Sequence, residues 1–432
     1  MLFYNLRKPS ERVDFRTATI QGLGTDKGLY FPEQIPEFPK EWIRNMDHLS
    51  DEEIAYAVVS PYVGNTIPED VLKKIVAETI AFDIPLVPVS ENISALELFH
   101  GPTLAFKDVG ARFMSRCLGH FMKGNARPVT VLVATSGDTG GAVANGFYEV
   151  EGVRVVILYP SGKVSSVQEL QLTTLGKNIS ALEVEGSFDD CQALVKQAFS
   201  DEELNSTIFL TSANSINVAR WLPQQIYYLL AWKQWKNKDK PPVFSVPSGN
   251  FGNICAGLLA YHSGLPVTHF IAACNANAVV PDFLKSGEYK PVKAKTTLSN
   301  AMDVGDPSNF VRVLELFNHQ FEPLKQTMSS ESISDEETAA IIRSVYAEHS
   351  YLMDPHGAVG YLALKRYLKD HAGDSGIFLE TAHPVKFYDV VEPIIEKSIP
   401  VPETVKILLN RNKTQVKIAA DYDSLKHFLL VS

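Results

Sequence analysis

Residues 129–213 decide the fold class, because they contain the runs VTVLVAT (129–135), VRVVILYP (153–160), ISALEVEG (179–186) and TIFLTSA (207–213). Each run is short and rich in β-branched residues, and a polar turn and a segment of helical length follow it. Regular alternation of strands and helices is typical of βαβ units, in which the strands run parallel. This part of the sequence therefore predicts an open parallel sheet flanked by helices.

A second series of strand signals begins with PVFSVPSG (242–249) and THFIAACN (268–275), and it ends with SGIFLETAHP (375–384). The lysine-rich stretch KQWKNKDKPP (233–242) separates the two series. It is most simply a solvated connection, with a nucleic-acid patch as the alternative interpretation. We expect an α/β protein with two open parallel-sheet domains that face each other across a cleft.

The expected domain boundaries follow these changes in the sequence. Residues 1–85 form an additional N-terminal region, in which proline-rich loops alternate with two helical patterns, DEEIAYAVVSPYV (51–63) and EDVLKKIVAETI (69–80). Residues 86–236 form the first α/β domain and residues 237–400 the second. The last segment, 401–432, is predicted to be a surface strand and helix packed on the second domain.

Composition narrows the class of protein. The chain has 432 residues, 45% of them hydrophobic, which is enough for two or three globular domains. Its formal net charge of −10 argues against nucleic acid and anionic membrane surfaces as partners. No stretch approaches the roughly 20 apolar residues of a membrane span. The chain also opens without an apolar run followed by a cleavage site, so no signal peptide is expected.

The four cysteines are widely spaced and form no CxxC pair, which is typical of a reduced, cytoplasmic protein. Common ligand motifs are missing too: the sequence has no GxxxxGK[ST], HExxH, EF-hand loop or GxSxG. The glycines of GLGTDKG (22–28) precede LYFPEQIP and no helical pattern, so we interpret them as a turn. We expect no metal site.

Three strand-to-helix turns are candidate ligand sites, because open α/β sheets bind ligands outside the carboxyl ends of their strands. The first is SGDTG (136–140), the second is GNFGN (249–253), and the third places Thr381 at a strand end. Glycines permit close backbone approach, and free N–H groups at helix N-termini favour anions. Taken singly, each turn can also be a simple connection.

Lys107 is the candidate reactive group. It follows an apolar, proline-containing turn and directly precedes a helical pattern that continues to residue 121. A helix N-terminus disfavours a cation, and burial beside Leu104, Ala105 and Phe106 would lower the pKa of the amine further. Both effects favour the neutral amine that Schiff-base chemistry needs. The alternative is a lysine that extends to solvent or pairs with Asp108.

A desolvated lysine, a glycine-rich anion cradle and a hydroxyl at a third strand end together match the needs of pyridoxal phosphate. Its aldehyde needs the amine, its phosphate needs the cradle, and its ring nitrogen needs a partner. Lys107, Gly249 and Thr381 are far apart in the sequence. They meet only if the two sheets face each other across a common cofactor cleft.

The motifs HGPTLAFKD (100–108), ATSGDTGGA (134–142), NSINVARWLPQ (214–224), PSGNFGN (247–253) and ETAHPVKF (380–387) together resemble threonine synthases. GLYFPEQIP and NAMDVGDPSNF add to the resemblance, which covers nearly the whole chain. These are pyridoxal phosphate enzymes related to the tryptophan synthase β subunit. The resemblance implies conversion of O-phosphohomoserine and water to threonine and phosphate, the last step of threonine biosynthesis.

The resemblance also implies roles for individual residues. Lys107 is the expected Schiff-base and catalytic lysine, Asp138 is expected near the ring hydroxyl, and Thr381 at the pyridine nitrogen. The expected cradle for the cofactor phosphate consists of Gly249, Asn250, Phe251, Gly252 and Asn253. The expected contacts to the substrate's phosphate are Ser136, Thr139, Asn214, Ser215 and Arg220. Arginine suits phosphate through its planar fork of donors, whereas the alternative for Arg220 is an exposed helix arginine.

Two other functions remain open on the sequence alone. One is a different reaction on the same fold, such as a serine or threonine dehydratase or a phospholyase, which product analysis would distinguish. The other is a catalytically silent binding relative, which loss of the lysine or the cradle would mark; both are intact. Many relatives in the wider superfamily carry asparagine where this chain has Asp138. We expect a small-molecule enzyme that is a monomer or a homodimer.

Overall fold

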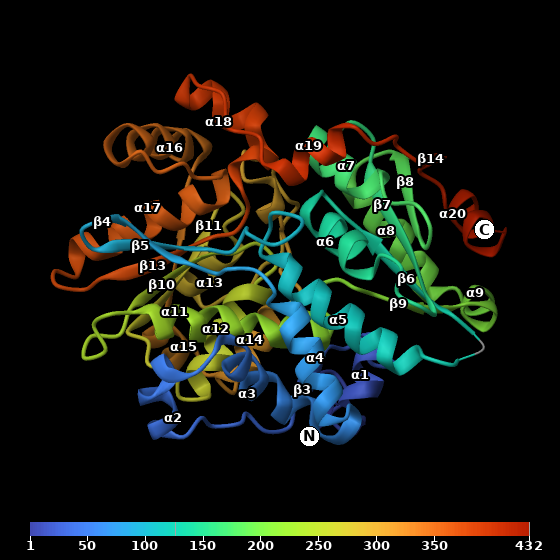
Figure 1. The fold of residues 1–432 in the computed structure, drawn as a ribbon, viewed down its shortest axis with the longest axis horizontal. Coiled ribbons are helices and arrows are strands. Elements are labelled where there is room, and N and C mark those ends of the chain that lie inside the picture. Colours follow the sequence, from blue (N-terminus) through green and yellow to red (C-terminus); the bar gives the residue numbers. More distant parts are fainter. Residues whose placement is uncertain (126, 432) are drawn as a thin grey trace.

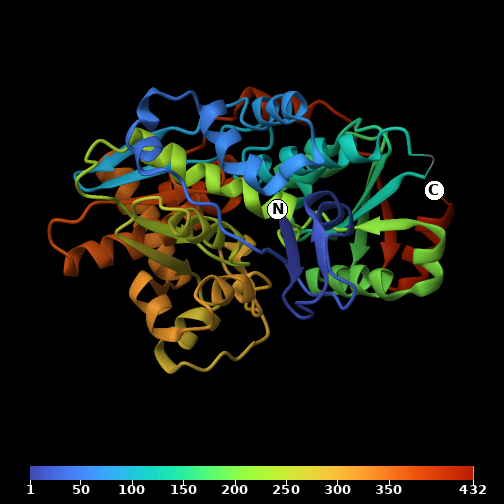
Figure 2. The same ribbon diagram turned by 90° about the horizontal axis from the view of Figure 1, so that it is seen from below.

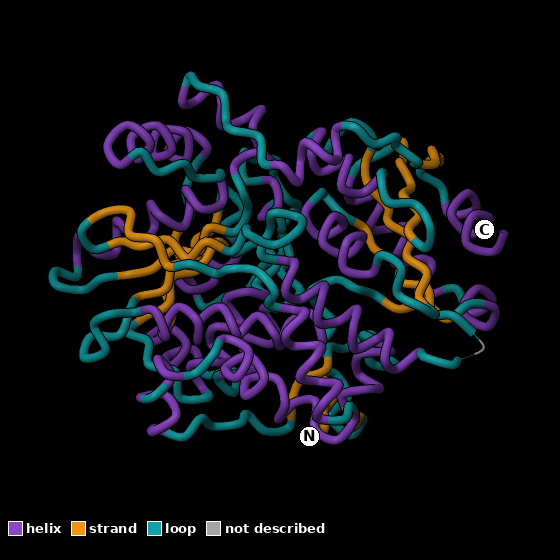
Figure 3. The backbone as a smooth tube through the Cα atoms, viewed as in Figure 1, coloured by secondary structure: helices purple, strands orange, loops and turns teal. Residues whose placement is uncertain are grey.

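The strands of the computed structural model, which describes residues 1–125 and 127–431, gather in two main groups at opposite ends of its longest axis (Figure 3). Helices surround both groups and fill the space between them (Figure 1). Each group is one sheet, of five and of six strands. The predicted fold class, two α/β domains with an additional N-terminal region, is confirmed.

The five-stranded sheet has the order β14-β8-β7-β6-β9 and is parallel throughout. Its strands are β6 (Val129–Ala134), β7 (Val153–Pro160), β8 (Ile179–Glu185), β9 (Phe209–Thr211) and β14 (Gln415–Ala419). The helices along this part of the chain are α5 (Lys107–Met122), α6 (Asp138–Phe147), α7 (Ser166–Thr173), α8 (Phe188–Ser200), α9 (Glu202–Thr207), α10 (Val218–Trp221) and α11 (Gln225–Gln234). Every residue of β6 is buried, because helices cover both faces of a parallel sheet. The four strand predictions for residues 129–213 are therefore confirmed.

The six-stranded sheet has the order β12-β11-β10-β13-β5-β4 and is parallel except at the pair of β4 with β5. Its strands are β4 (Leu86–Ser90), β5 (Ile93–Glu97), β10 (Val243–Pro247), β11 (His269–Cys274), β12 (Met328–Ser332) and β13 (Gly376–Glu380). Its helices include α12 (Gly252–His262), α13 (Val279–Ser286), α14 (Phe310–Leu316), α15 (Phe321–Thr327), α16 (Asp335–His349), α17 (Pro355–Asp370) and α18 (Tyr388–Ile395). We expected residues 86–97 in the first domain, and this was wrong. Their hairpin pairs with β13 and extends the second sheet.

The C-terminal segment contains α19 (Glu403–Leu409), β14 and α20 (Tyr422–Val431). A strand and a helix were expected here, but their predicted packing on the second domain was wrong. β14 pairs in parallel with β8, and α20 buries Leu425 and Leu429 in the apolar cluster that contains Leu194 of α8. The segment thus covers β8, which would otherwise be an open edge of the first sheet.

The N-terminal region has a small antiparallel sheet of order β2-β1-β3, which the sequence analysis did not predict. Its elements are β1 (Leu2–Asn5), β2 (Arg12–Asp14), α1 (Phe15–Gln21), β3 (Tyr30–Pro32), α2 (Lys40–Arg44), α3 (Asp51–Val63) and α4 (Glu69–Thr79). The helices α3 and α4 match the two predicted helical patterns. In Figure 2 the N-terminal strands lie between the two large domains. Among the described residues, no helix has the length and apolar character needed to cross a membrane.

Candidate active site

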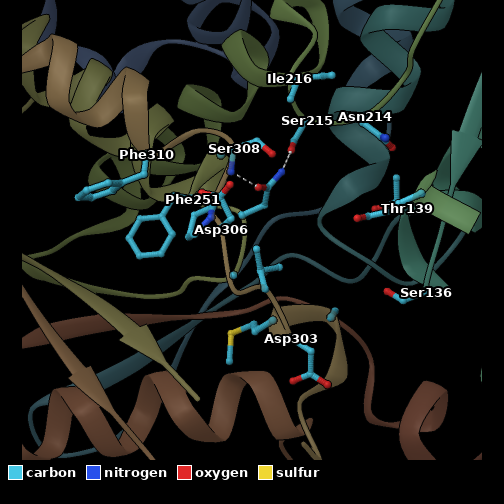
Figure 4. Close-up of a pocket in the computed structure, with 18 of the residues that line it drawn as sticks. Ser136, Thr139, Asn214, Ser215, Ile216, Phe251, Asp303, Asp306, Ser308 and Phe310 are labelled. Carbon is cyan, nitrogen blue, oxygen red and sulfur yellow. Dashed lines mark hydrogen bonds between the residues drawn. The ribbon is translucent and has the colours of Figure 1, made fainter. Parts of the chain in front are cut away.

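A cavity of about 960 Å³ lies between the two sheets, where β6, β10 and β13 end. Every site residue predicted from the sequence lines it: Lys107, Ser136, Asp138, Thr139, Asn214, Ser215, Arg220, Gly249, Asn250, Phe251, Gly252, Asn253 and Thr381. In Figure 4, Ser136, Thr139 and Asn214 lie on one side of the cavity and Phe251 on the other, with Ser215 between them. The predicted meeting of the three turns is confirmed, whereas the roles of the residues stay predictions.

Lys107 is the first residue of α5, and its side chain lines the cavity. Burial lowers the pKa of its amine to about 8; the carboxylate of Asp138 opposes this shift, and the cations Arg220 and Lys386 reinforce it. Asp108 accepts hydrogen bonds from Thr103, and no ion pair joins Lys107 to Asp108 among the described residues. Of the two interpretations offered above, the structure thus favours the desolvated amine.

Asp138 begins α6 and is buried beside Lys107, paired with a lysine that the sequence analysis missed. Lys386 Nζ lies 2.7 Å from the Asp138 carboxylate and donates to Thr103 O at 2.9 Å, and the lysine is fully buried. Gln168 Nε2 donates to the same carboxylate at 3.0 Å. Burial alone would raise the pKa of Asp138, but Lys386 and Lys107 outweigh it and hold that pKa well below its ordinary value. Asp138 is therefore an ionised carboxylate inside the cavity.

Lys386 lies within the motif ETAHPVKF, between Val385 and Phe387. Its apolar neighbours, just after a strand and a turn, were the only local sign in the sequence that this lysine is buried. Its partner, however, lies 248 positions earlier in the chain, and no local pattern predicts that pairing.

The glycine loop between β10 and α12 forms the opposite wall. Phe251, the residue before α12, has the left-handed φ of +61°, and the first N–H groups of α12 have no carbonyl partners within the helix. A Cβ on Gly249 would lie 2.6 Å from Met302 Cα, so only glycine fits there. A Cβ on Gly252 would lie 3.3 Å from Ser215 Cβ and Asn309 Nδ2. These features describe an anion cradle with close backbone approach.

Thr381 follows β13 and is tied to the turn before Lys107, because Phe106 N donates to Thr381 O at 2.8 Å. His356, which was not predicted, also lines the cavity. Its Nδ1 bonds the buried Asp354, and its Nε2 accepts from Ala301 N at 3.2 Å. Since a backbone N–H donates to Nε2, the proton of a neutral His356 lies on Nδ1.

The segment that precedes α10 supplies the third wall. Ser215 Oγ accepts from Asn250 Nδ2 at 2.7 Å (Figure 4), which joins the predicted substrate and cofactor regions. It also accepts from Asn309 Nδ2 at 3.1 Å. Arg220 is only 2% exposed, so the alternative of an exposed helix arginine is excluded. Its Nη1 donates to Ala213 O, its Nε has no hydrogen-bond partner among the described residues, and burial lowers its pKa to about 10.

These residues fit pyridoxal phosphate. The amine of Lys107, with its lowered pKa, suits an aldehyde, and the N-terminal turn of α12 with its tightly packed Gly249 suits a phosphate. Arg220 leaves a second buried cation without a carboxylate partner among the described residues, which suits a second anion in the same cavity. No group of three or more His, Cys, Asp or Glu suited to a metal was found in the described part of the chain.

Comparison with known proteins agrees with this site. Residues 86–379 match the family model described as "Pyridoxal-phosphate dependent enzyme". Residues 2–80 match "Threonine synthase N terminus", and residues 357–429 match "Threonine synthase, C-terminal". The chain is 46% identical to threonine synthase of Serratia marcescens over 100% of its length and 99% of the relative's.

Solved structures agree as well. The crystal structure of threonine synthase from Escherichia coli has a TM-score of 0.93 and 44% identity, covering 100% of this chain and 99% of that one. A pyridoxal-phosphate-bound threonine synthase from Brucella melitensis has a TM-score of 0.92 and 34% identity, covering 100% and 99%. The fold and the site define the chain as a pyridoxal-phosphate-dependent enzyme. Within that class, it belongs to the threonine synthase family.

Proposed function

We propose that this enzyme converts O-phosphohomoserine and water to L-threonine and inorganic phosphate in the cavity described above. The observation that supports the proposal most is the combination of two anion-binding features with one lysine whose pKa is lowered. The glycine loop before α12 suits the phosphate of the cofactor, and Arg220 suits the phosphate of a substrate. A dehydratase acting on unphosphorylated serine or threonine has no use for the second feature.

In this proposal the chain holds the cofactor at three points. The backbone from Gly249 to Asn253 binds the phosphate, Asp138 lies near the ring hydroxyl and Thr381 bonds the ring nitrogen. Bound pyridoxal phosphate supplies an electron sink that stabilises negative charge on the substrate carbons next to the amino group. The side chain of Thr381 is a neutral partner for the ring nitrogen, so it leaves that nitrogen less cationic than a carboxylate side chain would. Lys386 keeps Asp138 ionised.

Lys107 moves the protons. Its neutral Nζ accepts the Cα proton of the substrate and then assists removal of one from Cβ. The Cγ–O bond breaks and phosphate leaves. The oxygen of water then bonds to Cβ, and one of its protons goes to the phosphate that has left. Cγ gains a proton and Lys107 returns one to Cα, which completes threonine. Arg220, Ser215, Asn214, Ser136 and Thr139 hold the phosphate through these steps.

Product analysis tests the proposal. Purified enzyme with O-phosphohomoserine should release threonine and phosphate in equal amounts, whereas a dehydratase would release a keto acid and ammonia.

Lys107→Ala should abolish turnover while the fold stays intact. Arg220→Met should raise KM for the phosphorylated substrate strongly and leave the visible absorbance of bound cofactor unchanged. Wild-type kinetics for Arg220→Met would contradict the substrate assignment.

We also propose that the enzyme works in the cytoplasm as a monomer or a homodimer. The four cysteines, Cys117, Cys191, Cys255 and Cys274, are all buried and free, which suits a reducing compartment. Sedimentation equilibrium of the purified protein tests the oligomeric state.

A further inference from the structure

Arg312 of α14 is a fully buried arginine that the mechanism above does not use, and all of its N–H groups are bonded. Nε and Nη2 donate to Tyr30 O (3.1 and 2.8 Å), Nη2 donates to Ile216 O (2.7 Å), and Nη1 donates to Asn309 Oδ1 (2.8 Å) and Ser215 O (3.4 Å). Every acceptor is a neutral carbonyl oxygen. The guanidinium therefore fixes the backbone behind the cavity-lining Ser215, yet it has no counter-ion in the part of the chain that the structure describes.

The charge of Arg312 is uncompensated within the described residues, since no carboxylate lies within ion-pair distance of it. Arg220 also has no carboxylate within ion-pair distance among the described residues, although the more distant carboxylate of Asp108 partly offsets its charge. The Arg312 guanidinium lies 4.4 Å from the ring centroid of Trp221, the residue next to Arg220. Burial lowers the pKa of Arg312 to about 9 and that of Arg220 to about 10, so both are charged at neutral pH. Two buried guanidinium groups that have hydrogen bonds but no ion-pair partner are costly unless an anion joins them.

We infer that Arg312 is a positioning residue for the substrate's phosphate: it supplies a second positive charge from behind residues 215–216 and holds that segment in its binding conformation. This inference rests on the proposed function and extends it. A phosphate dianion would balance the two guanidinium charges. Arg312 does not line the cavity, so it acts through the Ser215 and Ile216 backbone and through Asn309. Its bonds to Tyr30 O give the N-terminal region a part in shaping the site.

Binding of inorganic phosphate to the cofactor-loaded enzyme, measured by calorimetry, tests this inference. Arg312→Met should raise the Kd for phosphate at least 10-fold and raise KM for O-phosphohomoserine by a similar factor. The visible absorbance of bound cofactor should not change. Arg312→Lys keeps the charge and should bind phosphate within about 3-fold of wild type, but with a lower kcat because lysine lacks the planar fork of donors.

Tyr4→Phe is the matched control. Tyr4 OH also bonds α14, through Glu315, so this variant loosens the same helix without touching a guanidinium. It should bind phosphate as wild type does. If Arg312→Met fails to fold, Arg312→Gln, which is neutral but retains donors, takes its place. Phosphate binding within 2-fold of wild type in the neutral variant, or equal weakening by Arg312→Lys and the neutral variant, would overturn the role of the charge.

The two proposals fail in different ways. If wild-type enzyme forms no threonine from O-phosphohomoserine but its phosphate affinity still depends on Arg312, the proposed function is wrong and the role of Arg312 in phosphate binding is supported. If threonine forms and the phosphate affinity does not depend on Arg312, the proposed function is supported and the role of Arg312 is wrong.

Discussion

At the residue scale, the reactivity of the site depends on an amine that burial keeps partly neutral. With a pKa of about 8, roughly half of Lys107 is neutral at pH 8, against well under about one per cent of an ordinary lysine. Between pH 8 and the ordinary value near 10.5, the unfolded chain binds more protons at this position than the folded one. The contribution of Lys107 to stability therefore rises with pH across that window.

Chemical labelling of the cofactor-free chain checks this expectation. The rate at which Lys107 reacts with trinitrobenzenesulfonate, followed by peptide mass spectrometry, should rise with pH with a midpoint near 8. Exposed lysines in the same digest should titrate near 10.5. A midpoint of 10 or above for Lys107 would show that its environment does not favour the neutral amine.

The variant Lys386→Met tests the buried ion pair between Lys386 and Asp138. Removing one partner of a buried ion pair leaves Asp138 uncompensated, which should cost about 3–5 kcal/mol of unfolding free energy. The freed carboxylate should also pull the labelling midpoint of Lys107 upward. Urea unfolding measures the first effect, and the labelling assay above measures the second. In the double variant Lys386→Met with Asp138→Asn, both effects should largely disappear; if they persist, Asp138 is not the group that Lys386 neutralises.

Individual site residues could be predicted where a strand or helix pattern in the sequence lies directly beside them. Lys107, the glycine loop and Thr381 each follow a strand signal or precede a helical one, and the structure brings them to one cavity. Lys386 and Arg312 were missed, because their partners are remote backbone oxygens or carboxylates. Such pairings depend on the tertiary fold and leave no spacing in the sequence.

At the element scale, the glycine loop before α12 has no room for a side chain at Gly249. Gly249→Ala puts a methyl group 2.6 Å from Met302 Cα, so the loop or the segment around Met302 must shift. We expect cofactor affinity to fall at least 10-fold, measured by titrating the cofactor-free protein and following visible absorbance. The control is Gly287→Ala, at an exposed glycine with a φ of +76°, where a Cβ meets nothing within 4 Å but the backbone is strained, so it separates backbone strain elsewhere in the chain from crowding at the cavity. Equal affinities for the Gly249 variant and wild type would place the phosphate elsewhere.

Burial explains part of which strands could be predicted, although the fully buried β3 was missed. β6, β7, β8 and β10 are almost entirely buried, and their sequences are short and mostly apolar with several β-branched residues. β12 has the sequence MSSES with one buried residue, so it carries no hydrophobic signal. β4 contains Pro88 and lies at the edge of its sheet, where proline is tolerated. Helices α3 and α4 were predicted because apolar residues recur at helical spacing.

At the scale of the whole molecule, the two large domains are distinct in space, but each takes strands from distant parts of the sequence. The hairpin of β4 and β5 belongs to the sheet built from residues 243–380, and β14 returns to the sheet that begins at residue 129. A strand's own residues show that it is a strand but not which sheet it joins, because parallel partners are remote in sequence. The N-terminal region contacts both sides, through Thr19 O with Asn217 and through Tyr30 O with Arg312.

The position of the C-terminal segment leads to the last prediction. Leu425 of α20 is fully buried against α8, so Leu425→Ala should lower the unfolding free energy by about 2–5 kcal/mol. Leu430→Ala on the same helix is the control, since Leu430 is 45% exposed and should change stability little. Because α20 and β14 cover the first sheet, hydrogen exchange should speed up in β8 and α8 and stay unchanged in β10 and β13. Faster exchange in β10 and β13, with β8 protected, would instead place the segment on the second sheet.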